Sequence, residues 1–423
     1  MSSGGLLQLV AVGAQDTYLT GNPNVTFFRV AYRRHTNFAI ESMAQTFSGT
    51  ADFGRKITTV LARTGDLVNK AYLQVDLPAL TANTGKTVAW TRNLGHAMLD
   101  EVFIEIGGSI IDRHYGMWYT IYNELTQSAE KFAGYNVMIG NTAALTTQAA
   151  AIPAATLYIP LIFWFNRNPA LALPLVALQY HETKMTVSFR NVADCYITSD
   201  LAPLTAIPSL QNVTLYVDYI FLDSAERTMM TQNQHEYLIE QVQSAGAESF
   251  SNSSVRVTLN LSHPCKEFIW VVQPDANVSG GANRWVDFTD AGNSGTAYAG
   301  NDPLVNAKIQ IGNHDRITTR KGSYFNLVQP YNHHTRIPAV GIYAYSFALN
   351  PETHQPSGSI NMSRIDNATI HMTLSTGTSP VRVYVFAVNY NIVRVVSGLA
   401  GLAFASALQF ESGFKAKAVC ALF

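Results

Sequence analysis

Short runs in which apolar and polar side chains alternate recur along most of the 423-residue chain, and they constrain its fold more than any other feature. The runs are rich in Val, Ile, Thr, Phe and Tyr, and Gly, Pro, Asn and Asp separate them, which is typical of β-strands joined by turns. Their number favours a β-sandwich architecture. The clearest predicted strands are residues 70–77, 101–108, 184–189, 213–222, 254–261, 308–312 and 381–390.

Two stretches are predicted to be helical. Residues 223–243, midway along the chain, begin at Asp223, whose carboxylate can cap the free N–H groups of a first helical turn. Residues 117–127 carry large apolar side chains at spacings of three, four and seven, so one face of this helix can pack on a sheet. That face comprises Trp118, Ile121, Tyr122 and Leu125.

Three pairs of segments resemble each other across the midpoint helix and keep the same order, which indicates an internal duplication. The lengths between corresponding segments differ, and loops tolerate such differences at little cost. We therefore expect two similar halves. The pairs are residues 104–113 with 309–316, 184–189 with 371–376, and 215–227 with 383–394.

Composition limits the functions that this chain can have. Its length predicts two domains, since a single core serves about 100–200 residues. Only 13% of the residues are charged, which suits a chain that hides much of its surface in large interfaces. The 28 basic and 29 acidic residues nearly cancel, so we expect no specific binding of nucleic acid.

No common catalytic or metal-binding pattern is present in the sequence. His333 and His334 are adjacent, so on a strand they would point to opposite faces, and no third metal ligand accompanies them. Asp100, Glu101 and Glu105 offer carboxylates for a β-sandwich glycosidase, but nothing indicates a cleft between them. We therefore expect no enzyme activity, no metal and no cofactor.

Residues 274–303 are dense in Gly, Asn, Asp and Ser and are predicted to form a long exposed loop, and residues 131–155 are predicted to form a second loop. The first loop contains Asn277, one of seven Asn-x-Ser/Thr acceptor sequences, which makes it a candidate glycosylation site. It also contains Trp285 and Tyr298, aromatic residues that support an alternative hypothesis, a carbohydrate-binding β-sandwich protein.

Arg29, Arg33 and Arg34 alternate with aromatic residues near the N-terminus. This mixture can bind single-stranded nucleic acid, but guanidinium groups also form bidentate pairs with carboxylates across subunit contacts. We favour subunit or inner-face contacts for these three arginines. The apolar stretch at residues 395–408 is shorter than the roughly 20 residues that span a bilayer, so we expect no transmembrane helix.

Several long motifs resemble the major capsid proteins of nucleocytoplasmic large DNA viruses, most closely those of chlorella viruses. They include "GGLLQLVAVGAQDTYLTGNPNVTFFRVAYRRHTNFAIES", "IEIGGSIIDRHY", "VDYIFLDSAERTMM", "DRITTRKGSYFNLVQPY" and "YSFALNPETHQPSGSINMSRIDNAT". The resemblance covers nearly the whole chain. It implies an all-β double jelly roll, that is, two consecutive eight-stranded antiparallel β-sandwiches with short helices in the connections.

The resemblance also implies partners and a location. It implies a homotrimer with a near-hexagonal outline that contacts neighbouring capsomers and minor capsid proteins in the icosahedral shell of a double-stranded DNA virus. An internal membrane would lie nearby without being spanned, assembly would occur in the host cytoplasm, and outward loops would carry glycans. With this resemblance, the alternative hypothesis becomes a carbohydrate-binding jelly-roll protein on the surface of a virion.

The expected domain organisation combines the duplication with the resemblance. An inward-facing segment at residues 1–25 precedes a first jelly roll at 26–222 and a linker helix region at 223–243. A second jelly roll at 244–400 is followed by a C-terminal tail at 401–423, which extends beyond the family's pattern.

Overall fold

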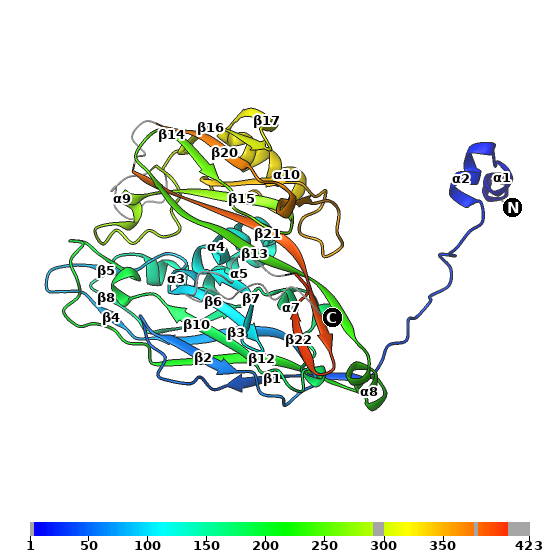
Figure 1. Cartoon of the computed structure of the whole chain (residues 1–423), viewed down its shortest axis with the longest axis horizontal. Coiled ribbons are helices and arrows are strands. Elements are labelled where there is room, and N and C mark those ends of the chain that lie inside the picture. Colours follow the sequence, from blue (N-terminus) through cyan, green and yellow to red (C-terminus); the bar gives the residue numbers. More distant parts are fainter. Residues whose placement is uncertain (1–3, 291–299, 376–379, 405–423) are drawn as a thin grey trace. The chain divides into compact units, whose positions relative to one another are not determined.

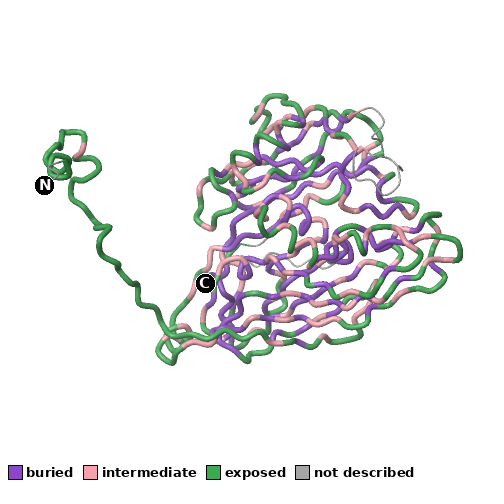
Figure 2. The backbone as a smooth tube through the Cα atoms, turned by 180° about the vertical axis from the view of Figure 1, so that it is seen from behind, coloured by how far each residue is buried: buried purple, intermediate pink, exposed green. Residues whose placement is uncertain are grey.

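The computed structural model describes residues 4–290, 300–375 and 380–404. Contacts between Cα atoms divide the chain into two units, residues 1–37 and 38–423. The first unit is built from α1 (Gly4–Val10), the 3-10 turn η1 (Ala14–Asp16) and α2 (Thr17–Thr20), with an extended stretch after them. Its described residues are almost all exposed (Figure 2). All further elements belong to the second unit, which begins twelve positions later than the predicted first jelly roll.

Two four-stranded antiparallel sheets form the first half of the second unit (Figure 1). One sheet has the order β1-β12-β3-β9 and the other has the order β2-β10-β6-β7. The strands of the first sheet are β1 (Phe38–Gln45), β12 (Asn212–Leu222), β3 (Leu67–Leu77) and β9 (Ala155–Pro160). Those of the second sheet are β2 (Lys56–Val60), β10 (Thr183–Phe189), β6 (Leu99–Ile106) and β7 (Ser109–Tyr115).

The second half repeats this plan. Its sheets have the orders β13-β21-β15-β18 and β14-β20-β16-β17. When the strands of each half are numbered along the chain, the two halves therefore place corresponding strands side by side in the same order. The first sheet contains β13 (His235–Phe250), β21 (Val381–Val396), β15 (Pro264–Pro274) and β18 (Ile342–Ser346), with β19 (Ile360–Asn361) and β22 (Leu399–Leu402) added. The second contains β14 (Ser254–Thr258), β20 (Ala368–Leu374), β16 (Leu304–Ile311) and β17 (His314–Lys321).

These paired sheets confirm the predicted all-β double jelly roll and the duplication. Every predicted strand is present, and the three similar sequence pairs fall on equivalent strands: β6 with β16, β10 with β20, and β12 with β21. The predicted domain boundaries remain a prediction, except that residues 401–402 belong to β22 and residues 405–423 of the predicted tail lie outside the described residues.

Alternation explains the strands of the first half. In β3, Leu73 and Val75 point into the core and are fully buried, whereas Tyr72 and Gln74 point to the outer face and are half-buried. β15 differs because it is buried on both faces: Trp270 joins the core of the second half, and Ile269 joins a separate apolar cluster on the other side of the sheet.

Short helices fill the connections. They are α3 (Leu94–Ala97), α4 (Gly116–Thr126), α5 (Ala129–Met138), α6 (Ala143–Thr146), α7 (Trp164–Arg167), α8 (Ser224–Gln232), α9 (Asp275–Val278) and α10 (Gln329–His333), which follows the π-helical turn η5 (Tyr324–Val328). Shorter 3-10 turns in the second unit are η2 (Pro169–Leu171), η3 (Leu175–Ala177), η4 (Val192–Asp194) and η6 (Met362–Arg364). Two-stranded ribbons pair β4 (Leu80–Thr81) with β8 (Ala151–Ile152) and β5 (Val88–Trp90) with β11 (Tyr196–Thr198).

The helix predictions are partly right. α4 confirms the helix at 117–127. The predicted helix at 223–243 is wrong beyond Gln232, because residues from His235 onward form β13, whose backbone groups pair with β21. Asp223 occupies the N-cap position of α8, but its side chain makes no capping hydrogen bond. The predicted loop at 131–155 is also wrong, since α5, α6 and the short strand β8 lie in this segment.

Candidate functional site

The two halves of the second unit meet where α4 of the first half lies on the outer face of sheet β13-β21-β15-β18 of the second half (Figure 1). Trp118, Ile121 and Leu125 on α4 are at most 2% exposed. They pack against apolar side chains of the sheet, and the rings of Trp118 and Phe386 are 5.5 Å apart. Burial of these large side chains stabilises the contact by about 2 kcal/mol each. The predicted apolar face of the helix is confirmed.

Hydrogen bonds fix the register of this junction. The backbone N–H of Val242 in β13 donates to the Asp112 carboxylate in β7 over 3.2 Å, and the Gln241 side-chain amide donates to the carbonyl of Ile111. The Arg336 guanidinium donates to Glu124 on α4 over 3.2 Å. Because the donors and acceptors come from different halves, sliding one half against the other would leave buried polar groups unpaired.

A buried carboxylate, Glu240 in β13, connects both halves electrostatically. Its two oxygens accept from Arg167 of α7 over 2.7 Å and pair with Lys266 of β15 over 2.6 Å. Burial alone would raise the pKa of Glu240, but the two cations hold it below its usual value. The cluster is therefore charged at neutral pH. Removing one partner would leave an uncompensated charge in a buried place, which is costly.

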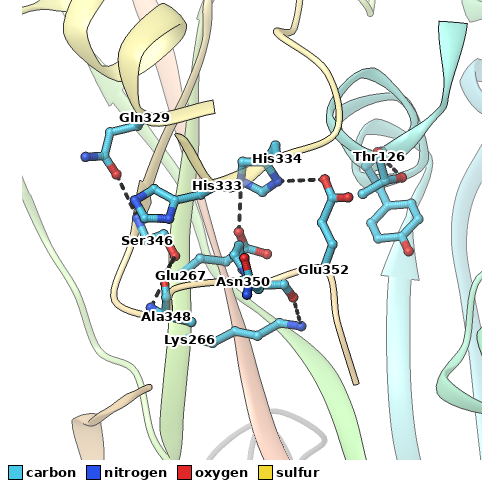
Figure 3. Close-up of polar contacts among 12 residues, drawn as sticks. Thr126, Lys266, Glu267, Gln329, His333, His334, Ser346, Ala348, Asn350 and Glu352 are labelled. Atoms are coloured by element: carbon cyan, nitrogen blue, oxygen red, sulfur yellow. Dashed lines mark hydrogen bonds and ion pairs between the residues drawn. The ribbon is translucent and has the colours of Figure 1, made fainter. Parts of the chain in front are cut away.

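A second buried group is His334, which lies between two carboxylates (Figure 3). Its Nε2 is 3.2 Å from a Glu267 oxygen, and its Nδ1 donates to Glu352 over 3.0 Å. Burial alone would lower the pKa of His334, but Glu267 and Glu352 raise it to about 9. His334 is therefore a cation that fastens the segment after α10 to β15 and to the loop around Glu352.

These clusters fasten parts of the fold together, and their geometry offers little else. Among the described residues, no group of three or more His, Cys, Asp or Glu side chains is placed to hold a metal ion. His333 bonds the carbonyl of Leu349, away from the two carboxylates that hold His334. Of the three carboxylates considered for a glycosidase, Glu101 is paired with Lys56 and Arg113. No helix in the described part of the chain is long and apolar enough to cross a membrane.

Asn277 contradicts the expectation of an exposed loop. Its side chain is fully buried, its amide nitrogen donates to the carbonyls of Asp287 and Thr289, and its carbonyl accepts from Arg284. A glycan attached to this nitrogen would need the space and the hydrogen bonds that these neighbours use. Glycosylation at Asn277 stays a prediction, and a glycan there would require these neighbours to move.

Trp285 also differs from the sequence-based expectation. It lines a pocket of about 580 Å³ between the two halves, but the Arg190 guanidinium covers its ring at 3.8 Å, and the indole N–H donates to the carbonyl of Asp194. Arg190 therefore covers one face of the indole ring, and that face is not available to stack on a sugar. Tyr298 lies outside the described residues.

Arg29, Arg33 and Arg34 all lie in the exposed stretch between α2 and β1. The same N-terminal unit exposes many large apolar side chains, which is unusual for a segment that stays in water. Their role in subunit or inner-face contacts stays a prediction. The exposed apolar residues are Leu6, Leu7, Leu9, Val10, Val12, Tyr18, Leu19, Val25, Phe27, Phe28, Val30 and Tyr32.

Sequence reasoning missed the ion clusters, because their members are far apart in the chain. Arg167, Glu240 and Lys266 have no common motif, and Glu240 lies in the segment predicted as a helix. One signal was available: charged residues inside otherwise apolar strands, such as Lys266 and Glu267 in β15, are expected to be paired.

Comparisons with known proteins agree with this architecture. Residues 26–223 match the family described as major capsid protein N-terminus, and residues 226–401 match the large eukaryotic DNA virus major capsid protein family. The chain therefore belongs to the major capsid proteins of large eukaryotic DNA viruses. It is a structural component of the virion shell.

Individual relatives support the same conclusion. The chain is 42% identical to the major capsid protein of Phaeocystis pouchetii virus, with 96% of this chain and all of the relative covered. It is 40% identical to the major capsid protein of Paramecium bursaria Chlorella virus 1, with 96% of this chain and all of the relative covered.

Among solved structures, the chain is similar to a subunit in the quasi-atomic model of the PBCV-1 virus capsid. The TM-score is 0.78 at 33% identity, with 90% of this chain and 100% of that chain covered. The Faustovirus major capsid protein, at 15% identity and a TM-score of 0.77, shares the fold, with 93% of this chain and 96% of that chain covered.

Proposed function

We propose that three copies of this chain form one capsomer with a near-hexagonal outline, which is the repeating tile of an icosahedral shell. The observation that carries the proposal is the identical strand order of the two halves in a capsid protein. Three chains with two equivalent halves supply six similar lobes, so a three-fold assembly presents six similar sides. Tiles of this outline cover a surface without large gaps.

Light scattering coupled to size-exclusion chromatography tests this proposal on the purified full-length chain. The chain has a mass of 46.3 kDa, and a particle of three times this mass is expected. A chain that stays monomeric at high concentration would overturn the trimer.

The N-terminal unit supplies the contacts with other components of the shell. Its exposed apolar side chains, together with Arg29, Arg33 and Arg34, suit a segment that is covered on assembly. Minor capsid proteins on the inner side of the shell, above an internal membrane that the chain does not span, are the proposed partners. Assembly takes place in the host cytoplasm.

The chain acts as a building block and not as an enzyme or a nucleic-acid-binding protein. Its relatives are structural capsid proteins, and its net charge of −1 gives no field that would attract a polyanion. The alternative of a carbohydrate-binding surface protein has less support, because Trp285 is covered by Arg190.

A further inference from the structure

A segment of the second half, residues 277–289, crosses to the first half and joins it away from α4. The segment begins in α9, and Figure 1 shows α9 and α7 at opposite ends of the junction between the halves. The Glu240 cluster fastens the halves at the α7 end. At the α9 end a pocket of about 580 Å³ lies between the halves, lined by Met117 of α4 and by Trp285 of the segment. Residues 277–289 bridge the halves beside this pocket, and we call them the strap.

Asn283 is the central attachment of the strap to the first half. Its side-chain amide donates to the carbonyls of Ala193 and Tyr196 over 2.6 and 2.7 Å. Its backbone carbonyl accepts from the Thr91 hydroxyl over 2.7 Å, and the residue is 3% exposed. Its φ of 47° is a left-handed backbone conformation, which asparagine adopts more readily than most residues. Loss of the side chain would leave two carbonyl groups at this contact without their donor.

Two further residues of the strap complete the contact. The Arg190 guanidinium of the first half lies 3.8 Å from the centre of the Trp285 ring, and the indole N–H donates to the carbonyl of Asp194 over 2.8 Å. Gly281 approaches the first half so closely that a Cβ atom there would lie 2.8 Å from the carbonyl oxygen of Leu201. The strap therefore fits the surface of the first half on both sides of Asn283.

Buried polar groups hold the strap itself in one shape. The Asn277 amide donates to the carbonyls of Asp287 and Thr289, and its side-chain carbonyl accepts from Arg284. Gln273 in β15 donates to the carbonyl of Asp287 over 2.7 Å. Asn277, Arg284 and Gln273 are at most 2% exposed, so water does not compete for these bonds. The strap is therefore rigidly connected to the sheet of the second half.

The strap also reaches the packed junction of the two halves. Phe288 is 2% exposed and lies in the same apolar cluster as Trp118 and Leu125 of α4 and Ile342 of β18. One short segment thus connects η4 and β11 of the first half with the contact between α4 and the sheet of the second half.

The angle between the two halves needs such a connection. A helix packed on a sheet leaves one motion open, in which the halves rock about the line of contact. Attachments at both ends of the junction oppose this motion, and the Glu240 cluster and the strap supply them. A three-fold axis relates whole copies and does not set the angle between the halves of one chain. Even spacing of six lobes therefore requires the chain itself to fix that angle.

We propose that the strap is a conformational lock, in which Asn283 and Trp285 fix the angle between the two halves so that three copies present six evenly spaced lobes. Without the lock, the halves rock about α4, the pocket beside the strap widens, and the lobes lose their even spacing. The inference rests on the proposed trimer, because the spacing of lobes is a property of the assembled capsomer.

Distances between two spin labels, one on each half, test the lock by double electron–electron resonance. The labels are attached to Thr84→Cys, in the turn between β4 and β5, and to Ser249→Cys in β13, and both positions are exposed. Cys420→Ser removes a further thiol, and Cys195 and Cys265 are buried, so neither reacts with the label. Labelled chains are diluted with unlabelled chains, so that only distances within one chain are measured.

Asn283→Gly removes the side-chain amide and keeps a residue that tolerates the left-handed backbone. The expected result is a longer mean distance and a broader distribution than in the parent chain, and the same is expected of Trp285→Leu. Asn313→Gly is the matched control, because Asn313 has a φ of 67° and lies exposed in the turn between β16 and β17, and it should give the parent distribution. A parent distribution in both strap variants would overturn the lock.

Hydrogen exchange gives a second readout that needs no label. The backbone N–H of Val242 donates to Asp112 across the junction, so its exchange rate rises when the halves rock. Loss of the hydrogen bonds of Asn283 should raise this rate about tenfold, whereas Asn313→Gly should leave it unchanged. An unchanged rate in Asn283→Gly and in Trp285→Leu would contradict the proposal.

Electron microscopy of the purified capsomer separates this inference from the proposed trimer. The parent chain should show six evenly spaced lobes, and Asn283→Gly should show three copies with unevenly spaced lobes. Evenly spaced lobes in the Asn283→Gly trimer would overturn the role of the strap in the outline and leave the trimer intact. A monomeric parent chain would overturn the trimer, while the distance between the spin labels would still decide whether the strap fixes the angle.

Discussion

α4 in the first half and η5 with α10 in the second half occupy the same place in the same fold, yet one is buried and the other is exposed. Tyr119 and Phe325 anchor the two connections to their own halves in the same way. What differs is the neighbour, since a sheet of the same chain covers Leu125, whereas no sheet among the described residues covers Tyr331. The difference teaches that equivalent positions of a duplicated fold can have different neighbours and therefore different burial.

Truncation of equivalent residues in α4 and α10 to alanine should give the largest difference in the free energy of unfolding. Leu125→Ala removes a side chain that is 1% exposed and is expected to lower the free energy of unfolding by about 3 kcal/mol, as for other buried leucines. Tyr331→Ala, at the matching exposed position, should change it by less than about 0.5 kcal/mol in the monomeric chain. Urea denaturation below the concentration of trimer formation gives both values. Equal losses would mean that the two faces are not in different environments.

Alkaline pH should weaken the second half through His334. Its folded pKa of about 9 lies above the unfolded value of about 6.5, so its stabilisation is complete below pH 6.5 and is lost as the pH rises through 9. The loss between pH 6 and pH 10 should reach about 3 kcal/mol. The unfolding midpoint in urea, measured across this range for the parent chain and for His334→Gln, isolates the effect. If the unfolding midpoint changes with pH by the same amount in both proteins, the His334 cluster carries no such stabilisation.

Acid pH, in contrast, should lower the stability of the first half through His96. Burial lowers the pKa of His96 to about 3, and the neutral ring bonds Thr120 of α4 and Tyr135 of α5. Because the unfolded chain binds a proton at about pH 6.5, the stabilisation is present above that value and falls away below it.

Between pH 7 and pH 5 the free energy of unfolding should decrease by about 2 kcal/mol on this account. His96→Gln cannot titrate, so its unfolding midpoint should depend less on pH in this range. A parent chain whose midpoint is constant from pH 7 to pH 5 would contradict the prediction.

The sequence predicted the strands and the duplication because a two-residue alternation is a local signal. It failed where a long-range contact decided the outcome. His235–Gln243 has the composition of a helix, but pairing with β21 makes it a strand. Asn277 lies in a loop-like sequence, but its folded neighbours bury it.

The candidate site was predictable only in part. The apolar spacing on residues 117–127 revealed a packing face, while the partner of that face lies more than a hundred residues away. Nothing in the sequence joins His334 to Glu267, or Arg167 to Glu240, since these pairs form only when the sheets come together.

A density map of the isolated capsomer by electron cryo-microscopy tests the central claim most directly. The account predicts three copies in a closed ring that presents six similar lobes, two from each chain. A capsomer with any other number of copies, or one without six similar lobes, would contradict it.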